Sequence, residues 1–232
     1  MNIAVILAGG TGSRFGNDVP KQFLKIAGKT VIEHTIAAFE CHPRIDEIAV
    51  VVHSQYVSTI EKMVIANEWG KVKKILVGGK ERYESSRVAI STYAGYPDSN
   101  LIFHDAVRPL VSRRIIDDVV AALRKHNAVG VAVPAIDTIV EVNRNKNFIE
   151  QIFTRDLLYK EQTPQGFKLS TIQAAYERAL QDPAFTSTDD CGVVVKYLPR
   201  EKVYVVRGEE TNIKLTYKED AYLLDKLFQM QG

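Results

Sequence analysis

The sequence has little of what marks several common protein classes. Among its 232 residues there are only two cysteines, Cys41 and Cys191, which match no metal-ligand or C-x-x-C spacing. The net charge of +2 is too small to indicate a nucleic acid or a membrane surface as a partner. No stretch approaches the roughly 20 apolar residues that span a bilayer, and the apolar run 3–8 is too short for a signal peptide. We therefore expect a cytoplasmic protein with reduced thiols, while a single disulfide stays an open alternative.

The rest of the composition is ordinary for a globular protein, with 46% hydrophobic residues, 25% charged residues and no low-complexity tract. The length suits one domain over residues 1–232, which buries enough surface to fold without metals or disulfides. Because the net charge is small, an anionic ligand must be bound by locally placed basic residues.

Short β-branched runs alternate with amphipathic helical patterns through the first two-thirds of the chain. Ile32, Ile36 and Phe39 have the i, i+4, i+7 spacing of one helical face. The other predicted elements are strands at residues 3–7, 47–52, 74–77, 101–104 and 129–133, and helices at 57–66, 85–93 and 115–126. This alternation predicts a Rossmann-like three-layer α/β sandwich with a mainly parallel sheet. Such sheets bind ligands beyond the carboxyl ends of their strands.

The alternation breaks in the middle of the chain. Two strand-like runs, 138–142 and 148–153, flank the polar segment 143–147 and predict an inserted β-hairpin arm at about 137–157. An isolated hairpin is only marginally stable in water, so this one needs a surface to pack on. We expect a second copy of the chain to supply it, which predicts a homodimer.

The last third of the chain predicts helices at residues 170–181 and 189–198, a strand at 202–206 and a final helix. Thr216 and Glu219 form a capping-box pattern at the start of that helix. Its apolar face is formed by Ala221, Leu224, Leu227 and Phe228.

A glycine-rich loop follows the first strand, with the sequence L-A-G-G-T-G-S-R-F-G at residues 7–16 and P-K-Q at 20–22. Glycines at this place let backbone N–H groups approach a phosphate chain. A Walker A loop is excluded because G-x-x-x-x-G-K-[ST] is absent. A dinucleotide-binding loop of an NAD-dependent oxidoreductase is disfavoured because Gly10, Gly12 and Gly16 are spaced one residue too wide. No acid for a ribose follows the second predicted strand either.

Two cations, Arg14 and Lys21, distinguish this loop. Nucleotidyl transfer builds negative charge around the α-phosphate and on the departing pyrophosphate, and preorganised cations stabilise that charge. A lone basic residue in a loop is usually solvated, and this alternative applies to both side chains. Their place beside a glycine-rich turn favours phosphate binding.

Further motifs follow in order along nearly the whole chain: G-G-K-E-R at 78–82, H-D-A-V-R-P at 104–109, Asp137-Thr138, Arg155, Q-T-P-Q at 162–165, Thr188-Asp189 and N-I-K at 212–214. Together with the loop at 7–22, this set resembles the cytidylyltransferases that form CDP-methylerythritol and CDP-ribitol. One such motif alone is weak evidence, whereas the ordered set is highly specific. The resemblance implies an enzyme that transfers CMP from CTP to a polyol phosphate and releases pyrophosphate.

The resemblance also implies roles for individual residues. Arg14, Lys21 and Lys214 would be catalytic, because they would bind the triphosphate and the reacting phosphate. The residues implied in nucleotide binding are Leu7, Ala8, Gly9, Gly10, Gly79, Arg82, Ser85 and Asp105. Those implied in acceptor binding are Asp105, Arg108, Thr138, Arg155, Thr163, Thr188 and Lys214. In the family the arm dimerises and presents residues such as Thr138 and Arg155 to the neighbouring subunit's acceptor phosphate.

Three of these assignments have structural alternatives. Asp105 follows the fourth predicted strand, where a carboxylate can bind Mg²⁺ against the phosphates, orient the acceptor, or cap the following turn. Thr188 equally fits a helix start at residues 187–190. Lys214 alone would be an ordinary surface lysine, so its role rests on the resemblance.

The implied mechanism is an in-line displacement at the α-phosphorus of CTP. The acceptor phosphate is already anionic, so no general base is needed and His104 receives no catalytic role. Catalysis would come from positioning and from charge neutralisation by the three cations and Mg²⁺.

The acceptor is the open part of the prediction. Lys80 stands where the methylerythritol branch often has an acid, and the segment 134–140 together with residues 3–14 is closer to the ribitol branch. We therefore expect D-ribitol 5-phosphate, with 2-C-methyl-D-erythritol 4-phosphate as the alternative and a ribulose-phosphate reductase as a pathway partner of the first. A non-catalytic CTP-binding sensor is the alternative of another class, disfavoured because Arg14, Lys21 and Lys214 are all present.

Overall fold

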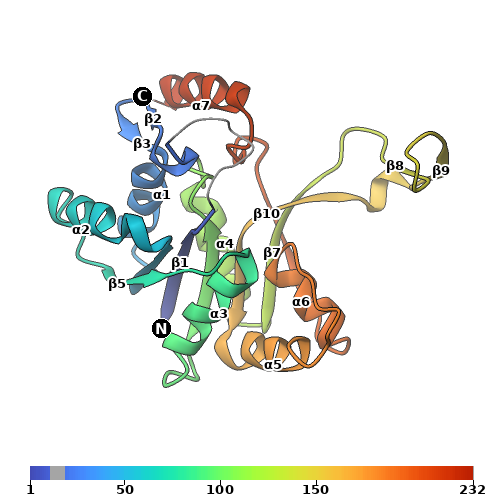
Figure 1. Cartoon of the computed structure of the whole chain (residues 1–232), viewed down its shortest axis with the longest axis horizontal. Coiled ribbons are helices and arrows are strands. Elements are labelled where there is room, and N and C mark those ends of the chain that lie inside the picture. Colours follow the sequence, from blue (N-terminus) through green and yellow to red (C-terminus); the bar gives the residue numbers. More distant parts are fainter. Residues whose placement is uncertain (11–18, 232) are drawn as a thin grey trace.

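The computed structural model describes residues 1–10 and 19–231 (Figure 1). Within these residues seven strands form one sheet in the order β11-β7-β10-β6-β1-β4-β5. The strands are β1 (Asn2–Ala8), β4 (Glu47–Val52), β5 (Val72–Val77), β6 (Asn100–Asp105), β7 (Ala128–Pro134), β10 (Tyr159–Lys168) and β11 (Val203–Arg207). Neighbours pair in parallel except at β10, which is antiparallel to both β6 and β7. The predicted mainly parallel sheet is confirmed.

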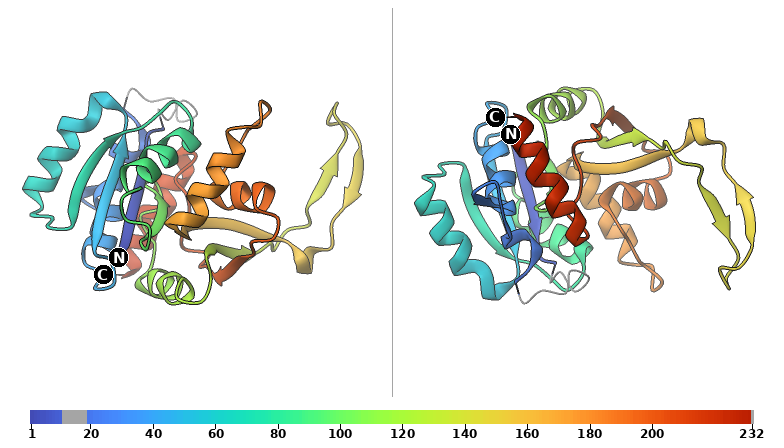
Figure 2. Two further views of the ribbon diagram at one scale, coloured as in Figure 1. Left: turned by 90° about the horizontal axis from the view of Figure 1, so that it is seen from below. Right: turned by 90° about the horizontal axis from the view of Figure 1, so that it is seen from above.

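Helices cover both faces of the sheet, as Figure 2 shows from two sides. One apolar cluster joins the sheet to α1 (Val31–Glu40), α2 (Val57–Ala66) and α4 (Arg113–Ala122). A second cluster joins the opposite face to α3 (Arg82–Thr92), α5 (Leu169–Ala179) and α6 (Asp190–Tyr197). Side chains alternate along a strand, so Ile6 of β1 lies in the first cluster and Val5 in the second. The three layers follow from this two-sided burial.

A third, smaller cluster lies under the C-terminal helix α7 (Lys218–Gln231). It includes Leu224 together with residues of the short hairpin formed by β2 (Lys25–Ile26) and β3 (Lys29–Thr30). The predicted apolar face of the last helix is thus confirmed. The predicted capping box is wrong, because Asp220 rather than Glu219 accepts hydrogen bonds from the backbone N–H groups of Thr216 and Tyr217, each at 2.7 Å.

The predicted hairpin forms the arm, with β8 (Val140–Val142) antiparallel to β9 (Ile149–Ile152) and a short 3-10 turn, η3 (Arg155–Leu157), after it. It extends away from the layered body in all views (Figures 1 and 2). Large apolar side chains of the arm are exposed, among them Phe148 at 72%, Ile149 at 60% and Ile152 at 63%.

Two predictions from the low cysteine content and the lack of long apolar stretches can be compared with the structure. Cys41 and Cys191 are both free thiols, so the open disulfide alternative is excluded. In the part of the chain that the structure describes, no helix has the length and apolar character needed to cross a bilayer.

Candidate active site

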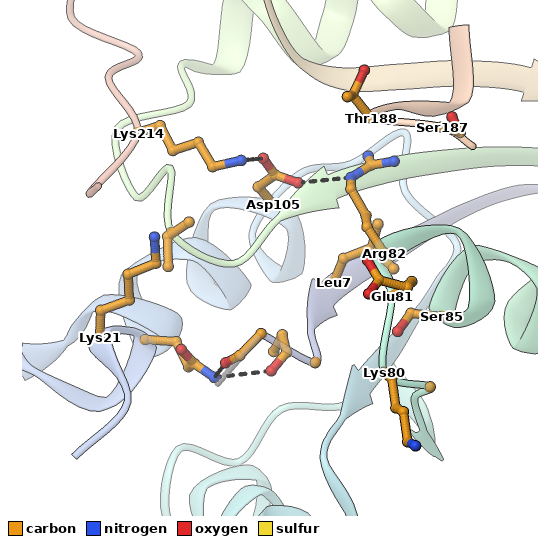
Figure 3. Close-up of a pocket in the computed structure, with 16 residues that line it drawn as sticks. Leu7, Lys21, Lys80, Glu81, Arg82, Ser85, Asp105, Ser187, Thr188 and Lys214 are labelled. Atoms are coloured by element: carbon orange, nitrogen blue, oxygen red, sulfur yellow. Dashed lines mark hydrogen bonds and ion pairs between the residues drawn. The ribbon is translucent and has the colours of Figure 1, made fainter. Parts of the chain in front are cut away.

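A cavity of about 560 Å³ opens where β1, β5 and β6 end (Figure 3). This is the edge at which parallel α/β sheets bind ligands. The residues that line it are Leu7, Ala8, Gly9, Gly10, Lys21, Gln22, Gly79, Lys80, Glu81, Arg82, Ser85, Asp105, Val107, Ser187, Thr188 and Lys214. The structure therefore gathers in one cavity every residue that the resemblance assigns to nucleotide binding.

The end of β1 is held in place by Gln22. Its side-chain amide is buried and donates hydrogen bonds to the carbonyls of Ala8, at 2.9 Å, and Gly10, at 3.0 Å. Lys21 precedes it in the short turn η1 (Lys21–Phe23) and lines the cavity. The P-K-Q motif thus holds the backbone of Ala8 and Gly10 and places a cation beside the cavity. Arg14 lies outside the described residues.

The loop after β5 approaches β1 closely because it carries glycine. A Cβ atom at Gly78 would lie 2.6 Å from the Ser85 hydroxyl oxygen, and one at Gly9 would lie 3.0 Å from it. Ser85 is itself buried in the first turn of α3. The amino end of α3 therefore borders the cavity, and a capping box formed by Glu81 and Glu84 occupies the backbone N–H groups of these two residues.

Asp105, at the end of β6, lies between two cations (Figure 3). Its Oδ2 is 2.7 Å from Lys214 Nζ, and its Oδ1 is 3.4 Å from Arg82 Nε. Burial alone would raise the pKa of Asp105, but the charges of Arg82 and Lys214 outweigh it and hold the pKa well below its usual range. Asp105 is therefore a carboxylate at neutral pH, and Lys214 is directed into the cavity.

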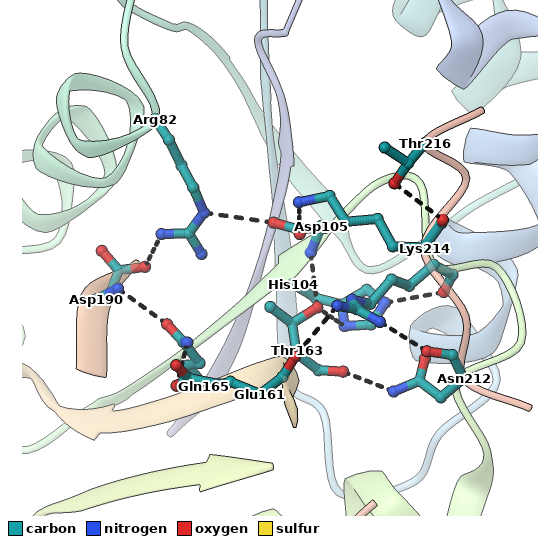
Figure 4. A network of polar contacts seen from close by, with 11 residues as sticks. Arg82, His104, Asp105, Glu161, Thr163, Gln165, Asp190, Asn212, Lys214 and Thr216 are labelled. Carbon is teal, nitrogen blue, oxygen red and sulfur yellow. Dashed lines mark hydrogen bonds and ion pairs between the residues drawn. The ribbon is translucent and has the colours of Figure 1, made fainter. Parts of the chain in front are cut away.

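Asp190 positions Arg82 from the opposite side (Figure 4). Its buried Oδ2 lies 2.7 Å from Arg82 Nη1, and its Oδ1 accepts a hydrogen bond from Tyr176 at 2.6 Å. Burial alone would lower the pKa of Arg82, but Asp190 and Asp105 raise it above its ordinary value. The sequence analysis missed Asp190. The only available signal was a second acid next to the Thr188-Asp189 motif.

Thr163 connects the sheet to Asp105 through a chain of hydrogen bonds (Figure 4). The Asp105 N–H donates to Thr163 Oγ1 at 3.1 Å, and Thr163 Oγ1 lies 3.0 Å from Nδ1 of His104. His104 Nε2 lies 3.0 Å from the Arg108 carbonyl, which can only accept, so Nε2 carries the proton and Nδ1 accepts from the threonine hydroxyl. Burial lowers the pKa of His104 to about 4, so the ring is neutral and structural.

A second cavity of about 160 Å³ adjoins the first. It is lined by Arg82, Asp105, Arg108, Glu161, Gln162, Thr163, Gln165, Thr188, Asp189 and Lys214. Four of these residues, Arg82, Asp105, Thr188 and Lys214, also line the larger cavity and so form a common wall. Two ligands placed in the two cavities would meet at Asp105 and Lys214.

The predicted acceptor residues divide between the body and the arm. Arg108, Thr163 and Thr188 line the second cavity, and Arg108 Nη1 donates to the Asn212 carbonyl at 2.7 Å. Asp189, not Thr188, caps α6, since its side chain accepts from the Gly192 N–H. Thr138 and Arg155 lie on the arm and line neither described cavity.

Asp105 can hold Mg²⁺ only together with the nucleotide, whose phosphate oxygens would supply further ligands. Among the described residues no group of three His, Cys, Asp or Glu side chains is placed to hold a metal ion. Mg²⁺ commonly takes one or two carboxylates and completes its shell with substrate phosphates and water. A single carboxylate at the cavity wall fits that pattern.

Comparison with known proteins shows which family the chain resembles. A sequence profile of the IspD family, described as 2-C-methyl-D-erythritol 4-phosphate cytidylyltransferase, matches residues 2–229. The bifunctional ribulose 5-phosphate reductase/CDP-ribitol pyrophosphorylase Bcs1 of Haemophilus influenzae is 49% identical over 232 residues, which are 100% of this chain and 49% of that protein. The chain therefore spans about half the length of Bcs1.

Two further relatives match over most of both chains. The 2-C-methyl-D-erythritol 4-phosphate cytidylyltransferase of Thermobifida fusca is 44% identical over 230 residues, which are 97% of this chain and 92% of that protein. The crystal structure of 4-diphosphocytidyl-2C-methyl-D-erythritol synthase from Anaerococcus prevotii superposes with a TM-score of 0.84 at 30% identity, covering 99% of this chain and 98% of that one.

Proposed function

The chain belongs to the IspD family of cytidylyltransferases, and we propose that it transfers CMP from CTP to D-ribitol 5-phosphate. The family and the Thermobifida fusca relative are named for cytidylyltransferase activity, which makes this chain a CTP-dependent nucleotidyltransferase. The observation that carries the proposal is the common wall of the two cavities, where Asp105 and Lys214 would lie between a nucleotide and an acceptor. The choice of ribitol phosphate is supported by the likeness to the Haemophilus influenzae CDP-ribitol pyrophosphorylase over the whole of this chain. The reductase half of that relative makes a polyol-phosphate reductase the proposed pathway partner.

In this mechanism the reaction is one displacement at phosphorus. An oxygen of the acceptor phosphate forms a bond to the α-phosphorus while the bond from that phosphorus to the bridging oxygen breaks. Pyrophosphate leaves with the electron pair, and CDP-ribitol remains. Lys21 and Lys214 would stabilise the charge that develops on the phosphate oxygens, since preorganised cations act most strongly in the transition state. Arg14 is assigned the same task on the resemblance alone.

Mg²⁺ is the proposed cofactor, with Asp105 as its protein ligand. When bound, the ion would neutralise charge on the triphosphate. Asp105 is suited to this because its carboxylate is ionised at neutral pH and faces the cavity.

A second copy of the chain is proposed to complete the acceptor site. The arm exposes Phe148, Ile149 and Ile152, whose burial against a partner would be favourable. Arg155, at the base of that arm, would then bind the acceptor phosphate in the partner's cavity through its two-pronged guanidinium group. Thr138 would add a hydroxyl contact.

The first test is pyrophosphate release with CTP, Mg²⁺ and either D-ribitol 5-phosphate or 2-C-methyl-D-erythritol 4-phosphate. We expect a clear preference for the ribitol acceptor and little release with UTP or ATP. Lys214→Gln should lower kcat/KM by about 100-fold or more, as loss of a transition-state donor does. Lys218→Gln, an exposed lysine at the start of α7, is the matched control and should leave it unchanged. A preference for the methylerythritol acceptor would replace the proposed substrate with the alternative.

The shared site has a separate test. If Arg155 acts across the dimer, Arg155→Ala and Lys214→Gln proteins are each nearly inactive at an acceptor concentration far below the KM of the Arg155→Ala protein. Mixing them in equal amounts would restore about one quarter of wild-type activity, because half of the dimers are mixed and each has one intact site. No recovery on mixing would contradict the cross-subunit role.

A further inference from the structure

Two carboxyl groups line the second cavity at a place that the displacement chemistry does not use. Glu161 belongs to β10, and Asp189 caps α6, yet both border the same space as Thr163 and Thr188. The Gln165 side-chain amide donates to Glu161 Oε1 at 2.7 Å, and the same Gln165 accepts from the backbone N–H of Asp190 at 3.0 Å. The pair is thus held by a polar framework that joins β10 to α6 (Figure 4).

The environment of Glu161 favours its protonated form. Burial of the carboxyl group and the neighbouring Asp189 side chain raise the pKa of Glu161 toward neutrality. Burial, together with Glu161, raises the pKa of the Cys191 thiol well above its usual value. The Glu161 carboxyl group accepts from Gln165 and keeps further oxygen lone pairs that can accept from hydroxyl groups of a ligand.

The second cavity is therefore lined by cations in one part and by acids in another. Its wall toward the larger cavity carries the cations Arg82 and Lys214, while Arg108 lines the cavity beside Glu161, whose carbonyl accepts from Arg108 Nη2 at 3.5 Å. The part bordered by Glu161 and Asp189 carries acids. A phosphate is attracted to the first region and repelled by the second, whereas hydroxyl groups can bond to the acids.

We propose that Glu161, held by Gln165 at the wall of the second cavity, is a specificity-determining residue that binds hydroxyl groups of the acceptor's carbon chain. It would favour a linear alditol phosphate over a methyl-branched one. The proposal rests on the proposed function, because it takes the second cavity as the acceptor site.

The preference follows from what each acceptor places against the acids. Every carbon of ribitol 5-phosphate that lacks the phosphate carries a hydroxyl group, so its chain offers a hydrogen bond at each position. The methylerythritol chain is shorter and carries a methyl group. An acceptor whose hydroxyl groups cannot reach the acids forgoes these hydrogen bonds, and a site built to bond a hydroxyl group discriminates against a ligand that does not supply it.

The test measures kcat/KM for both acceptors in wild type, Glu161→Ala and Glu161→Gln, with the KM for CTP recorded in each. Glu161→Ala should lower kcat/KM for ribitol 5-phosphate by about tenfold, the loss expected for one hydrogen bond. The value for methylerythritol 4-phosphate and the KM for CTP should change by less than about threefold. Glu161→Gln, which keeps hydrogen-bonding atoms, should lose less. Glu177→Ala, an exposed glutamate on α5, is the matched control.

The two acceptors separate specificity from damage to the fold. If Glu161→Ala lowers kcat/KM for both acceptors by the same factor, or for neither, the inference is wrong while the wild-type preference for ribitol phosphate still supports the proposed function. If wild type prefers the methylerythritol acceptor, the proposed acceptor is wrong and the inference fails with it.

Discussion

The buried ion pair between Asp190 and Arg82 predicts a large loss of stability for Asp190→Asn. The Asp190 side chain is 0% exposed and lies 2.7 Å from the guanidinium group. Asparagine has almost the same size, so the change removes the charge and leaves little empty space. It also places an amide where the carboxylate accepted hydrogen bonds from Arg82 and from the Tyr176 hydroxyl.

The size of the effect follows from the burial of the pair. Removing one partner of a buried pair costs about 3–5 kcal/mol, because the other charge stays buried without compensation. Arg82 keeps Asp105 as a second partner at 3.4 Å, which places the expected loss near the lower end. For a chain of this length about 3 kcal/mol lowers the Tm by roughly 6–12 °C.

The assay is thermal unfolding of Asp190→Asn beside Asp118→Asn. Asp118 makes the same kind of pair with Arg114, at 2.8 Å, but on the surface of α4, where both side chains are nearly half exposed. Surface pairs at i,i+4 contribute about 0.3–0.5 kcal/mol, so this control should lose only about 1 °C. If the two variants melt within about 2 °C of each other, the buried pair does not stabilise the fold as argued.

Three further predictions concern the cavity wall and the buried His104 behind it. Gln22→Leu removes two hydrogen bonds from the glycine-rich loop and should raise the KM for CTP by about tenfold with a smaller change in kcat, measured by initial rates. EDTA should abolish pyrophosphate release and MgCl₂ restore it, while Asp105→Asn should raise the Mg²⁺ concentration for half-maximal rate by about tenfold or more. The pKa of His104 is about 4 in the folded protein, so the unfolded chain binds more protons between that value and 6.5. The stability that the neutral His104 ring contributes is present above pH 6.5 and lost as pH falls. The free energy of unfolding of wild type, measured in urea, should therefore fall by roughly 2 kcal/mol more than that of His104→Gln between pH 7 and pH 5.

The parallel part of the fold could be predicted from the sequence because each element carries its own pattern. The strand at 47–52 and the helix at 57–66 have the predicted bounds. Strand β10 was not predicted, because Pro164 interrupts it and proline within a run argues against a strand. The structure tolerates Pro164 because the register of β10 against β7 shifts between Gln162 and Gln165.

The candidate site was predictable in its residues but not in its contacts. The motifs identified Asp105, Arg82 and Lys214, yet the ion pairs of Asp105 join positions 23 and 109 residues apart. No periodicity or spacing predicts such a contact, since it depends on how the sheet brings strand ends together. Asp190 was missed for the same reason, because its partner Arg82 is 108 residues away.

Strand β10 runs from the arm to the site. The arm can therefore act in two ways that experiments can separate: it supplies Arg155, and it fixes the position of β10. Its first residues pair with β7 next to the arm, and further along Thr163 accepts the hydrogen bond from Asp105. If a second copy holds the arm, it fixes the strand that carries Glu161 and Thr163 in addition to supplying Arg155. Arg155→Ala would then raise the acceptor KM alone. Ile149→Asp, which removes an apolar contact of the arm, would weaken the dimer as well and lower kcat at low protein concentration, with recovery as the concentration rises. If both variants have the same kcat and acceptor KM at every protein concentration, dimerisation through the arm does not fix β10 as argued.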